Sequence, residues 1–215
     1  TEAASRCRSC PDQAVRTGWS TGRDPSRSSG QRLRALAINT ISSAQATRGT
    51  HAILAGLVAE INETCNVGML DGHEVIYVDR VECDWPLRVQ LRAGSHVPVH
   101  CTAIGKLLLA YMEQEQRSLI LSTAKLKKYT KYTIDDPKLL ESQLEQIAAQ
   151  GYSINNQEDA IGLIALAVPV SDENGNIVAG LAVHAPEPRY SIAKAIEDLP
   201  KFRDAAEKIG VAMFS

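Results

Sequence analysis

The sequence contains no uninterrupted run of about 18 apolar residues, the length that a membrane-spanning helix requires. Its first ten residues, TEAASRCRSC, lack the apolar core of a secretory signal. We therefore expect a soluble protein that stays in the cytoplasm and has no membrane partner.

Cysteines are few and scattered: Cys7, Cys10, Cys65, Cys83 and Cys101. Their odd number and wide spacing do not fit a disulfide framework and are typical of a reducing compartment. Cys7 and Cys10 form a CxxC pair, but a zinc site needs four ligands, usually with a second such pair, and none follows. We predict no metal site, although His96, His100 and Cys101 are the residues that could complete one.

Two phosphate-binding motifs are also absent, because the chain has neither GxGxxG after a strand nor GxxxxGK[ST]. No dinucleotide, nucleoside triphosphate or other cofactor is predicted. The 215 residues, of which 44% are hydrophobic and 22% charged, suit a globular protein with one sizeable domain.

The net charge of −2 gives the whole chain no general attraction to nucleic acid. Between Arg6 and Arg34, however, seven arginines stand among only two acids. This segment is either a phosphate-contacting arm or the remnant of a DNA-binding module, or it is a solvated tail, and charge alone leaves these readings open.

Apolar spacing divides the chain into three parts. Residues 1–30 are rich in Arg, Ser, Gly and Pro and cannot bury enough surface to fold alone. Helical spacing then runs from Leu33 to Ala44 and again from Ile53 to Ile61, with a bend predicted at Gln45–Thr50. We assign a flexible segment to 1–30, a linker helix to 31–47 and the main domain to 48–215.

The main domain begins with strands. Val67–Leu70 and Val75–Val78 flank Asp71-Gly72, which predicts a two-residue hairpin turn. Leu87, Val89 and Leu91 alternate with polar residues, and this pattern predicts a third strand with one buried face.

Helices and a second group of strands follow. We predict an apolar helix from Thr102 and two or three further helices within Glu113–Gln150, the last starting at Pro137. The predicted later elements are strands at Tyr152–Asn155, Leu163–Val170 and Ile177–His184, and a helix over Ser191–Phe214 that Pro200 breaks. An Asn-Gly pair at 174–175 predicts the turn of the last hairpin. Hairpins and segregated helices make the class α+β.

Three segments have residues suited to chemistry. The helix that follows Thr102 starts with small residues, so its free amides could hold an anion, or Gly105 could simply allow close packing. His100 could activate Cys101 as a nucleophile, but chain neighbours rarely face each other, and a packing role for Cys101 is favoured.

His184 lies beside small residues, as in a cavity wall or on a wet surface. The polar run 155–159 is either a ligand contact or a solvated turn.

Three segments together resemble the IclR family of bacterial transcription regulators over roughly Gln31 to Ser215. They are VAEINETCNVGMLDGHEVIYVDRVE (58–82), PVHCTAIGKLLLA (98–110) and GYSINNQEDAIGLIALAVPVSDENGNIVAGLAVHAP (151–186). The resemblance implies a GAF-like domain with a curved, mainly antiparallel six-stranded sheet flanked by helices. It also implies a small-molecule pocket, a homodimer or homotetramer, and operator DNA as a partner through an N-terminal winged helix-turn-helix.

Such a winged helix-turn-helix takes about 60 to 70 residues, and some 30 precede the linker helix here. Thr17–Arg27 resembles the family's wing, while the helices before it are not found. We therefore expect the DNA-reading part to be largely absent from this sequence.

The resemblance places the effector-binding residues at Val89, Leu91, Ala103, Ile104, Asn155, Ala165, Ala182 and His184. It assigns the effector carboxylate to the backbone amides of Ala103 and Ile104, and the apolar wall to Val89 and Leu91. At the other four positions relatives carry an acid, a cysteine and two serines, in that order. Their loss at Asn155, Ala165 and Ala182 predicts a roomier site for an effector with an aromatic body and one carboxylate.

We therefore predict a ligand-sensing domain of an IclR-type regulator and no enzyme activity. Two alternatives remain at this point: a stand-alone sensing module without a DNA partner, and a hydrolase that uses Cys101 or His184.

Overall fold

A computed structural model of the chain describes residues 44–85, 91–124 and 126–214. The strands within these ranges are β1 (Thr64–Asp71), β2 (Glu74–Val81), β3 (His96–Pro98), β4 (Ser153–Asn156), β5 (Leu163–Ser171) and β6 (Ile177–Pro186). The helices there are α2 (Ala44–Ile61), α3 (Ala103–Ala110), α4 (Gln114–Thr123), α5 (Pro137–Gln150), α6 (Ile192–Glu197) and α7 (Leu199–Phe214). No helix in these ranges is long and apolar enough to cross a bilayer.

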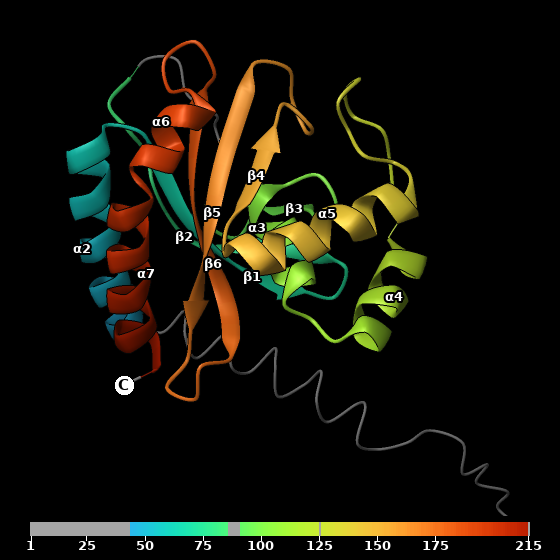
Figure 1. Cartoon of the computed structure of the whole chain (residues 1–215). Coiled ribbons are helices and arrows are strands. Elements are labelled where there is room, and N and C mark those ends of the chain that lie inside the picture. The colour runs from blue at the N-terminus through green and yellow to red at the C-terminus, as the bar shows by residue number, and fades with distance from the viewer. Residues whose placement is uncertain (1–43, 86–90, 125, 215) are drawn as a thin grey trace, which may run out of the picture. The chain divides into compact units, whose positions relative to one another are not determined.

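One curved sheet organises the domain. Its strand order is β3-β2-β1-β6-β5-β4, and every neighbouring pair is antiparallel. Strand β6 pairs with β1, so the β1–β2 hairpin and the β5–β6 hairpin lie next to each other in one sheet (Figure 1). The predicted six-stranded antiparallel sheet is confirmed.

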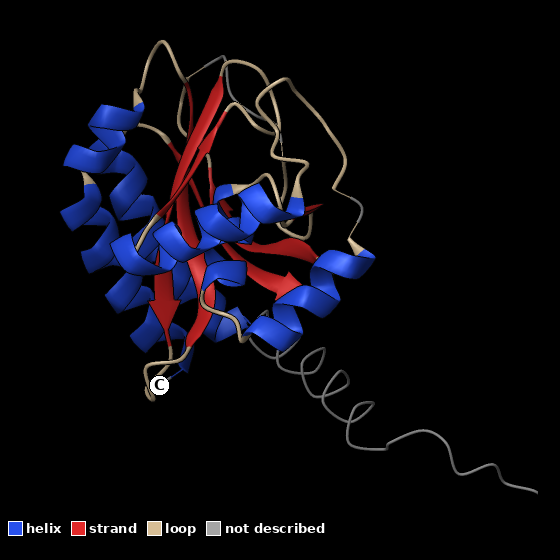
Figure 2. Ribbon diagram, turned by 45° about the vertical axis from the view of Figure 1, so that its right-hand side comes forward, coloured by secondary structure: helices blue, strands red, loops and turns tan. Residues whose placement is uncertain are grey.

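Each face of the sheet has its own core and its own helices (Figures 1 and 2). On the α7 face, α2, α6 and α7 pack over one apolar cluster, to which β6 contributes Leu181 and Val183. On the α3 face, α3 and α5 pack over a second cluster, which receives Ala182 from the same strand. Because side chains alternate along a strand, successive residues of β6 contribute to the two cores in turn.

Helix α3 begins where Thr102 caps it, with the Thr102 hydroxyl donating to the Pro98 carbonyl at 2.6 Å and accepting from the Gly105 amide at 3.3 Å. All eight residues of this helix are buried. An added Cβ at Gly105 would lie 2.2 Å from the carbonyl oxygen of Val99, in the turn that leads into α3. Gly105 therefore allows the helix to pack closely against this turn, whereas the prediction was that it packs on the sheet.

The bend predicted at Gln45–Thr50 is wrong, because helix α2 runs unbroken through these residues. The next strand described after the first hairpin is β3 at His96–Pro98, which the sequence did not predict. Of the predicted third strand only Leu91 is described, and it lies in a loop. Val89 and the other residues of 86–90 lie outside the described residues, as do 1–30 and most of 31–47.

Hairpin turns differ in detail from their predictions. The first turn residues are Gly72 and His73, one position later than expected, because Asp71 pairs with Glu74. Gly72 has a φ of 63°, which Gly adopts at no steric cost. In the last hairpin Gly175 alone of the Asn-Gly pair has positive φ, and Asp172 organises the turn by accepting from the amides of Asn174 and Asn176. The expected break falls at Asp198, and α7 begins at Leu199 with Pro200 in its first turn.

The glycines of α2 and α3 give opposite predictions for alanine substitution. Gly105→Ala should destabilise the domain by about 1–3 kcal/mol or more, because the new methyl group meets the Val99 backbone. Gly56→Ala, in α2, has open space and should stabilise it by about 0.5–1 kcal/mol through helix propensity. Urea unfolding of both variants measures the difference, and equal effects would contradict the close approach of α3.

Candidate functional site

Cross-strand pairing sets up three rows of residues on the α3 face, since residues directly opposite each other share a face. The His184 row contains Asn155, Ala165, His184 and Thr64. The Ala182 row contains Ser153, Ala167, Ala182, Asn66 and Arg80. The glycine row contains Pro169, Gly180, Gly68 and Tyr77. The first two rows have polar residues around a patch of alanines.

The start of α3 is held next to these rows by the glycine row. Added Cβ atoms at Gly180 and Gly68 would lie 3.0 and 3.1 Å from Ile104 side-chain carbons. The Ile104 side chain is therefore a packing group, and its backbone amide is what it can offer to a ligand. The amides at a helix start have no intrahelical acceptor, so those of Ala103 and Ile104 are suited to an anion.

Six of the residues predicted from the sequence come together on this face. Ala103, Ile104, Ala165 and Ala182 belong to the α3-face core or its rows, and Asn155 and His184 share the His184 row. Leu91 is half-buried against the same core. Val89 lies outside the described residues, so its predicted place in the apolar wall stays a prediction.

His184 is buried without a partner for its ring. It is 5% exposed, and neither ring nitrogen has a hydrogen-bond partner. Its ring meets the edge of Tyr77 at a centroid distance of 6.1 Å. Burial, assisted by the charge of Arg80, lowers the pKa of His184 to about 3. The imidazole is therefore neutral near pH 7 and can donate one hydrogen bond and accept another.

Sequence reasoning missed Tyr77 and Arg80. Both lie on the α3 face because the ladder between β1 and β2 shifts at Val67/Gly68, which leaves Val78 as an extra residue in β2. In a regular strand, Tyr77 and Arg80 would point to opposite faces, because they are three residues apart. The only signal in the sequence is a charged pair, Asp79-Arg80, inside an otherwise apolar strand.

Arg80 brings a nearly buried cation to the Ala182 row. Its side chain is 2% exposed, and its Nε lies 3.6 Å from a carboxylate oxygen of Glu82. Burial lowers the pKa of this guanidinium, and the nearby Tyr77 and Glu82 oppose that shift. Burial also raises the pKa of Tyr77 to about 12, so its phenol keeps its proton.

The polar run after β4 is not a solvated turn. Asn155 accepts from the Glu158 amide at 2.8 Å and donates to the Asp159 carboxylate at 2.7 Å. The hydroxyls of Thr130 and Thr133 donate to the carbonyls of Gln157 and Glu158 at 2.7 and 2.5 Å. These bonds define an effector-side loop, residues 157–162, whose conformation is closely specified.

A buried ion pair joins this loop to α3. Lys106 is fully buried, and its ammonium group bonds the Glu158 carboxylate and, at 2.8 Å, the Gln143 side chain of α5. Burial lowers the pKa of Lys106 and raises that of Glu158, while their mutual attraction favours the charged forms. We treat both as charged, because each supplies the other's counterion.

Cys101 is not an activated nucleophile. It is fully buried, and burial raises the pKa of its thiol to about 12, a shift that Asp159 and Glu158 reinforce. His100 instead donates from Nε2 to the Lys127 carbonyl at 3.0 Å. The thiol therefore stays protonated and has no base beside it. The packing role favoured for Cys101 agrees with this geometry.

The residues considered for a metal site have other partners. His96, on β3, contacts the carboxylate of Asp71 at the end of β1, with 2.9 Å between His96 Nε2 and the nearer oxygen. His100 bonds to the Lys127 carbonyl instead. Among residues 44–85, 91–124 and 126–214, no group of three or more His, Cys, Asp or Glu side chains could hold a metal ion.

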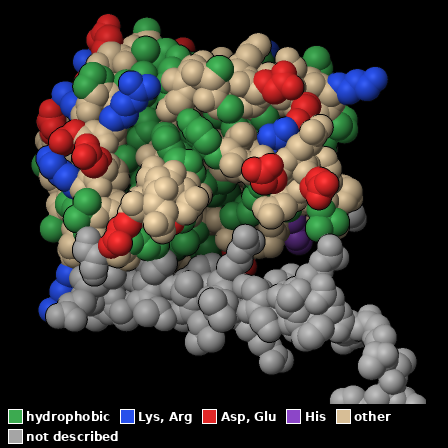
Figure 3. All heavy atoms as spheres, turned by 60° about the horizontal axis from the view of Figure 1, so that its bottom comes forward, with side chains coloured by type: hydrophobic (Ala, Val, Ile, Leu, Met, Phe, Trp, Pro, Cys, Tyr) green, Lys and Arg blue, Asp and Glu red, His purple; other side chains and the backbone are tan. Residues whose placement is uncertain are grey.

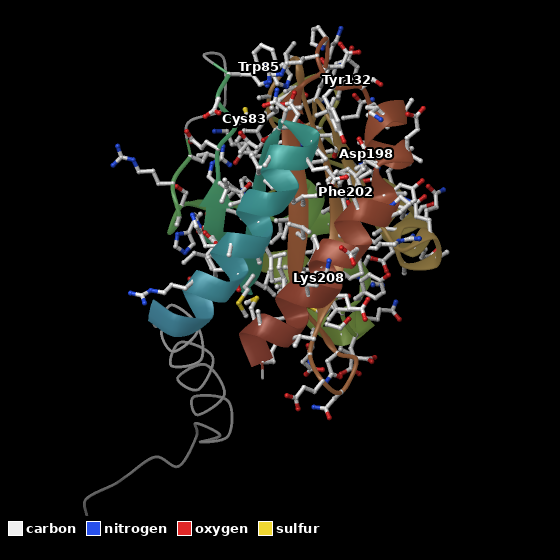
Figure 4. The ribbon with its side chains drawn as sticks, turned by 90° about the vertical axis from the view of Figure 1, so that its left-hand side faces the viewer. Cys83, Trp85, Tyr132, Asp198, Phe202 and Lys208 are labelled. Atoms are coloured by element: carbon white, nitrogen blue, oxygen red, sulfur yellow. The ribbon has the colours of Figure 1, made fainter. Side chains whose placement is uncertain are left out.

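Two surface hollows lie away from this site. One, of about 470 Å³, is lined by residues from the β5–β6 hairpin and α7, including Asp172 and Arg203. Figure 3 views the molecule from its hairpin end, where apolar side chains gather in the middle of the face and charged ones stand around them. The other, of about 580 Å³, is lined by residues of α2 and α7, which lie side by side in Figure 4.

The Lys106–Glu158 pair should be sensitive to the loss of one partner. Lys106→Met leaves a buried carboxylate without its counterion and should cost about 3–5 kcal/mol of unfolding free energy. The double variant Lys106→Met/Glu158→Gln should recover at least half of that loss. Lys208→Met, which breaks an exposed pair with Asp204, should change stability by less than about 1 kcal/mol. Chemical denaturation of these four proteins and of Glu158→Gln measures these values, and a double variant whose loss equals the sum of the two single losses would rule out coupling.

His184 should make stability depend on pH. Its pKa is about 3 in the folded protein and 6.5 ordinarily, so between these values the unfolded chain binds a proton that the folded protein does not. Stability is therefore lost as the pH falls below 6.5. Between about pH 7 and about pH 5 the parent should lose about 2 kcal/mol more than His184→Gln. Equal losses in urea titrations would show that His184 accepts a proton when folded.

Comparison with known proteins identifies the family. The model for the bacterial transcriptional regulator IclR C-terminal family matches residues 38–211. The probable transcriptional regulator SauR of Cupriavidus necator is 40% identical over 178 residues, which cover 83% of this chain and 71% of that protein. The transcriptional regulator KdgR of Escherichia coli is 35% identical over 151 residues, 70% of this chain and 57% of that protein.

Solved structures agree with this match. The C-terminal domain of E. coli KdgR has a TM-score of 0.71 at 30% identity, covering 80% of this chain and 99% of that one. The inducer-binding domain of the transcription factor PobR from Acinetobacter, a double mutant in complex with 3-hydroxybenzoic acid, has a TM-score of 0.70 at 29% identity, covering 76% and 97%. This chain belongs to the IclR family of bacterial transcriptional regulators, and its described domain is the family's C-terminal domain.

Proposed function

We propose that this domain is a cytoplasmic sensor that binds a small organic acid with an aromatic body between the start of α3 and the His184 and Ala182 rows. The observation that carries the proposal is His184, a buried neutral imidazole with two unpartnered nitrogens. An unsatisfied buried polar atom costs about 1–3 kcal/mol, a cost that a ligand making the missing hydrogen bond removes.

The rest of the site suits the two ends of such a molecule. The backbone amides of Ala103 and Ile104 stand at the positive end of the α3 dipole and are suited to a carboxylate. Three alanines, Ala165, Ala167 and Ala182, lie in the middle of the rows. The surface there is apolar and has no bulky side chain, which favours a flat ring. His184 then takes a polar substituent of that ring.

A structural neighbour supports the class of ligand. The similar domain of PobR was crystallised with 3-hydroxybenzoic acid, an aromatic acid with a second polar group. We extend that class of effector to this chain because the same fold here has alanines and one imidazole where a ring and its substituent would lie.

Effector binding would act through the assembly of the regulator. We infer that the protein is a homodimer or homotetramer and that a bound effector changes its geometry and its affinity for operator DNA. Sensing of this kind requires only that the effector bind one arrangement more tightly than another, and coupling of about 1–3 kcal/mol is typical. Helix α2, which leads out of the described domain toward the N-terminus, is the element suited to carry the change.

Ligand screening tests the proposal. Benzoate and its hydroxy derivatives, at about a hundredfold excess over their Kd, should stabilise the protein by about 2.7 kcal/mol and raise Tm by several degrees. His184→Ala should weaken the binding of a hydroxybenzoate about tenfold through the loss of one hydrogen bond. Differential scanning fluorimetry and isothermal titration calorimetry give the two quantities.

The matched control is His73→Ala, because His73 is an exposed histidine in the first hairpin turn. This variant should bind like the parent. Stabilisation by short keto acids such as pyruvate, with no effect of aromatic acids, would contradict the proposed ligand class. Unchanged binding by His184→Ala would remove His184 from the site.

A further inference from the structure

Asn155 stands where the family resemblance places an acidic ligand contact, but its amide is occupied within the protein. Its oxygen accepts from the Glu158 amide at 2.8 Å, and its nitrogen donates to the Asp159 carboxylate at 2.7 Å. Asn155 is fully buried. Its main effect is therefore to hold Asp159 at the edge of the His184 row.

Asp159 is anchored more firmly than a residue in a surface turn. Its neighbour Glu158 is bonded to the buried ammonium group of Lys106, and Thr133 donates to the Glu158 carbonyl. The Asp159 side chain lies close enough to the Tyr77 hydroxyl and the Cys101 thiol for its charge to raise the pKa of both. The bond from Asn155 and the effect of its charge on Tyr77 and Cys101 place the Asp159 carboxylate on the side of the effector-side loop that faces the α3 face.

A carboxylate at this place restricts what can bind beside it. Burial raises the pKa of the Asp159 carboxyl, and the hydrogen bond from Asn155 opposes that shift by favouring the ionised form. The ionised carboxylate only accepts hydrogen bonds, so a group that meets it must donate. An ether oxygen or a second carboxylate of the effector would meet repulsion there. The helix start, in contrast, requires an anionic group on the same molecule.

We propose that Asp159, positioned by Asn155, selects effectors that carry a hydroxyl group in addition to their carboxylate. Relatives have an acidic residue at the position of Asn155. In this chain Asp159, four residues later, supplies the carboxylate instead. Asp159 is a specificity-determining residue in this scheme, and the scheme rests on the proposed function, since it assumes that an aromatic acid binds at the α3 start.

Calorimetry with matched ligands tests the selection. Benzoate, 3-hydroxybenzoate, 4-hydroxybenzoate and the two corresponding methoxybenzoates present the same carboxylate with a donor, an acceptor or neither. The parent protein should bind its preferred hydroxybenzoate at least about tenfold more tightly than the methoxy analogue, because hydrogen bonds to charged groups contribute that much. In Asp159→Asn the ratio should fall below about threefold, since a carboxamide also donates.

Two controls make the outcome specific. Glu173→Gln neutralises an exposed acid in the β5–β6 turn and should leave the ratio at the parent's value. The Asp159→Asn side chain keeps an oxygen that can accept from Asn155, so its Tm should remain close to the parent's.

The outcomes separate the selection from the proposed function. A parent that binds hydroxy and methoxy acids equally, or an Asp159→Asn variant with the parent's ratio, overturns the role of Asp159 and leaves the aromatic-acid site in place. A parent that binds none of the five ligands overturns the proposed function itself. If Asp159→Asn does not fold, the parent's own ratio decides, and a value near one overturns the selection.

Discussion

The candidate site depends on one buried ion pair. Lys106 of α3 and Glu158 of the effector-side loop are the groups that hold a helix start and a loop against each other beneath the surface. Moving two charges out of water costs several kcal/mol for each, and the cost is offset here by their attraction and by the further bond from Lys106 to Gln143. An apolar pair could pack as well, but it would specify the loop conformation less closely than a buried ammonium group that must meet both Glu158 and Gln143.

Around this pair the site combines close packing with unsatisfied polar atoms. Helix α3 lies close to the sheet because Gly68 and Gly180 have no side chains that would meet Ile104. Near the same helix start, the hydroxyl of Ser153 and both nitrogens of His184 are buried without partners. The strands that carry these polar atoms are fixed by their ladders, so the unsatisfied atoms are held in place beside the packed helix.

Much of the fold could be predicted from local patterns. Thr102 as a helix cap, Pro137 at the first turn of α5 and Pro200 after a helix break each act through backbone chemistry that neighbours in the chain determine. Strand β3 could not be found in this way, because it is only three residues long and is defined by its pairing with β2. The bend predicted near Gly49 is absent, since Gly49 packs against Ala212 of α7 and the helix continues.

The sequence by itself determined the order of elements, the hairpins, the cap of α3 and the positions that would line its start, because these follow from spacing and from residues near one another in the chain. Only the tertiary structure decided which polar groups share the α3 face. A single extra residue in β2 brings Arg80 beside His184, and an asparagine that resembles a lost ligand contact turns out to hold Asp159. Register shifts and long-range pairing decide such contacts, and neither leaves a periodic signal in the sequence.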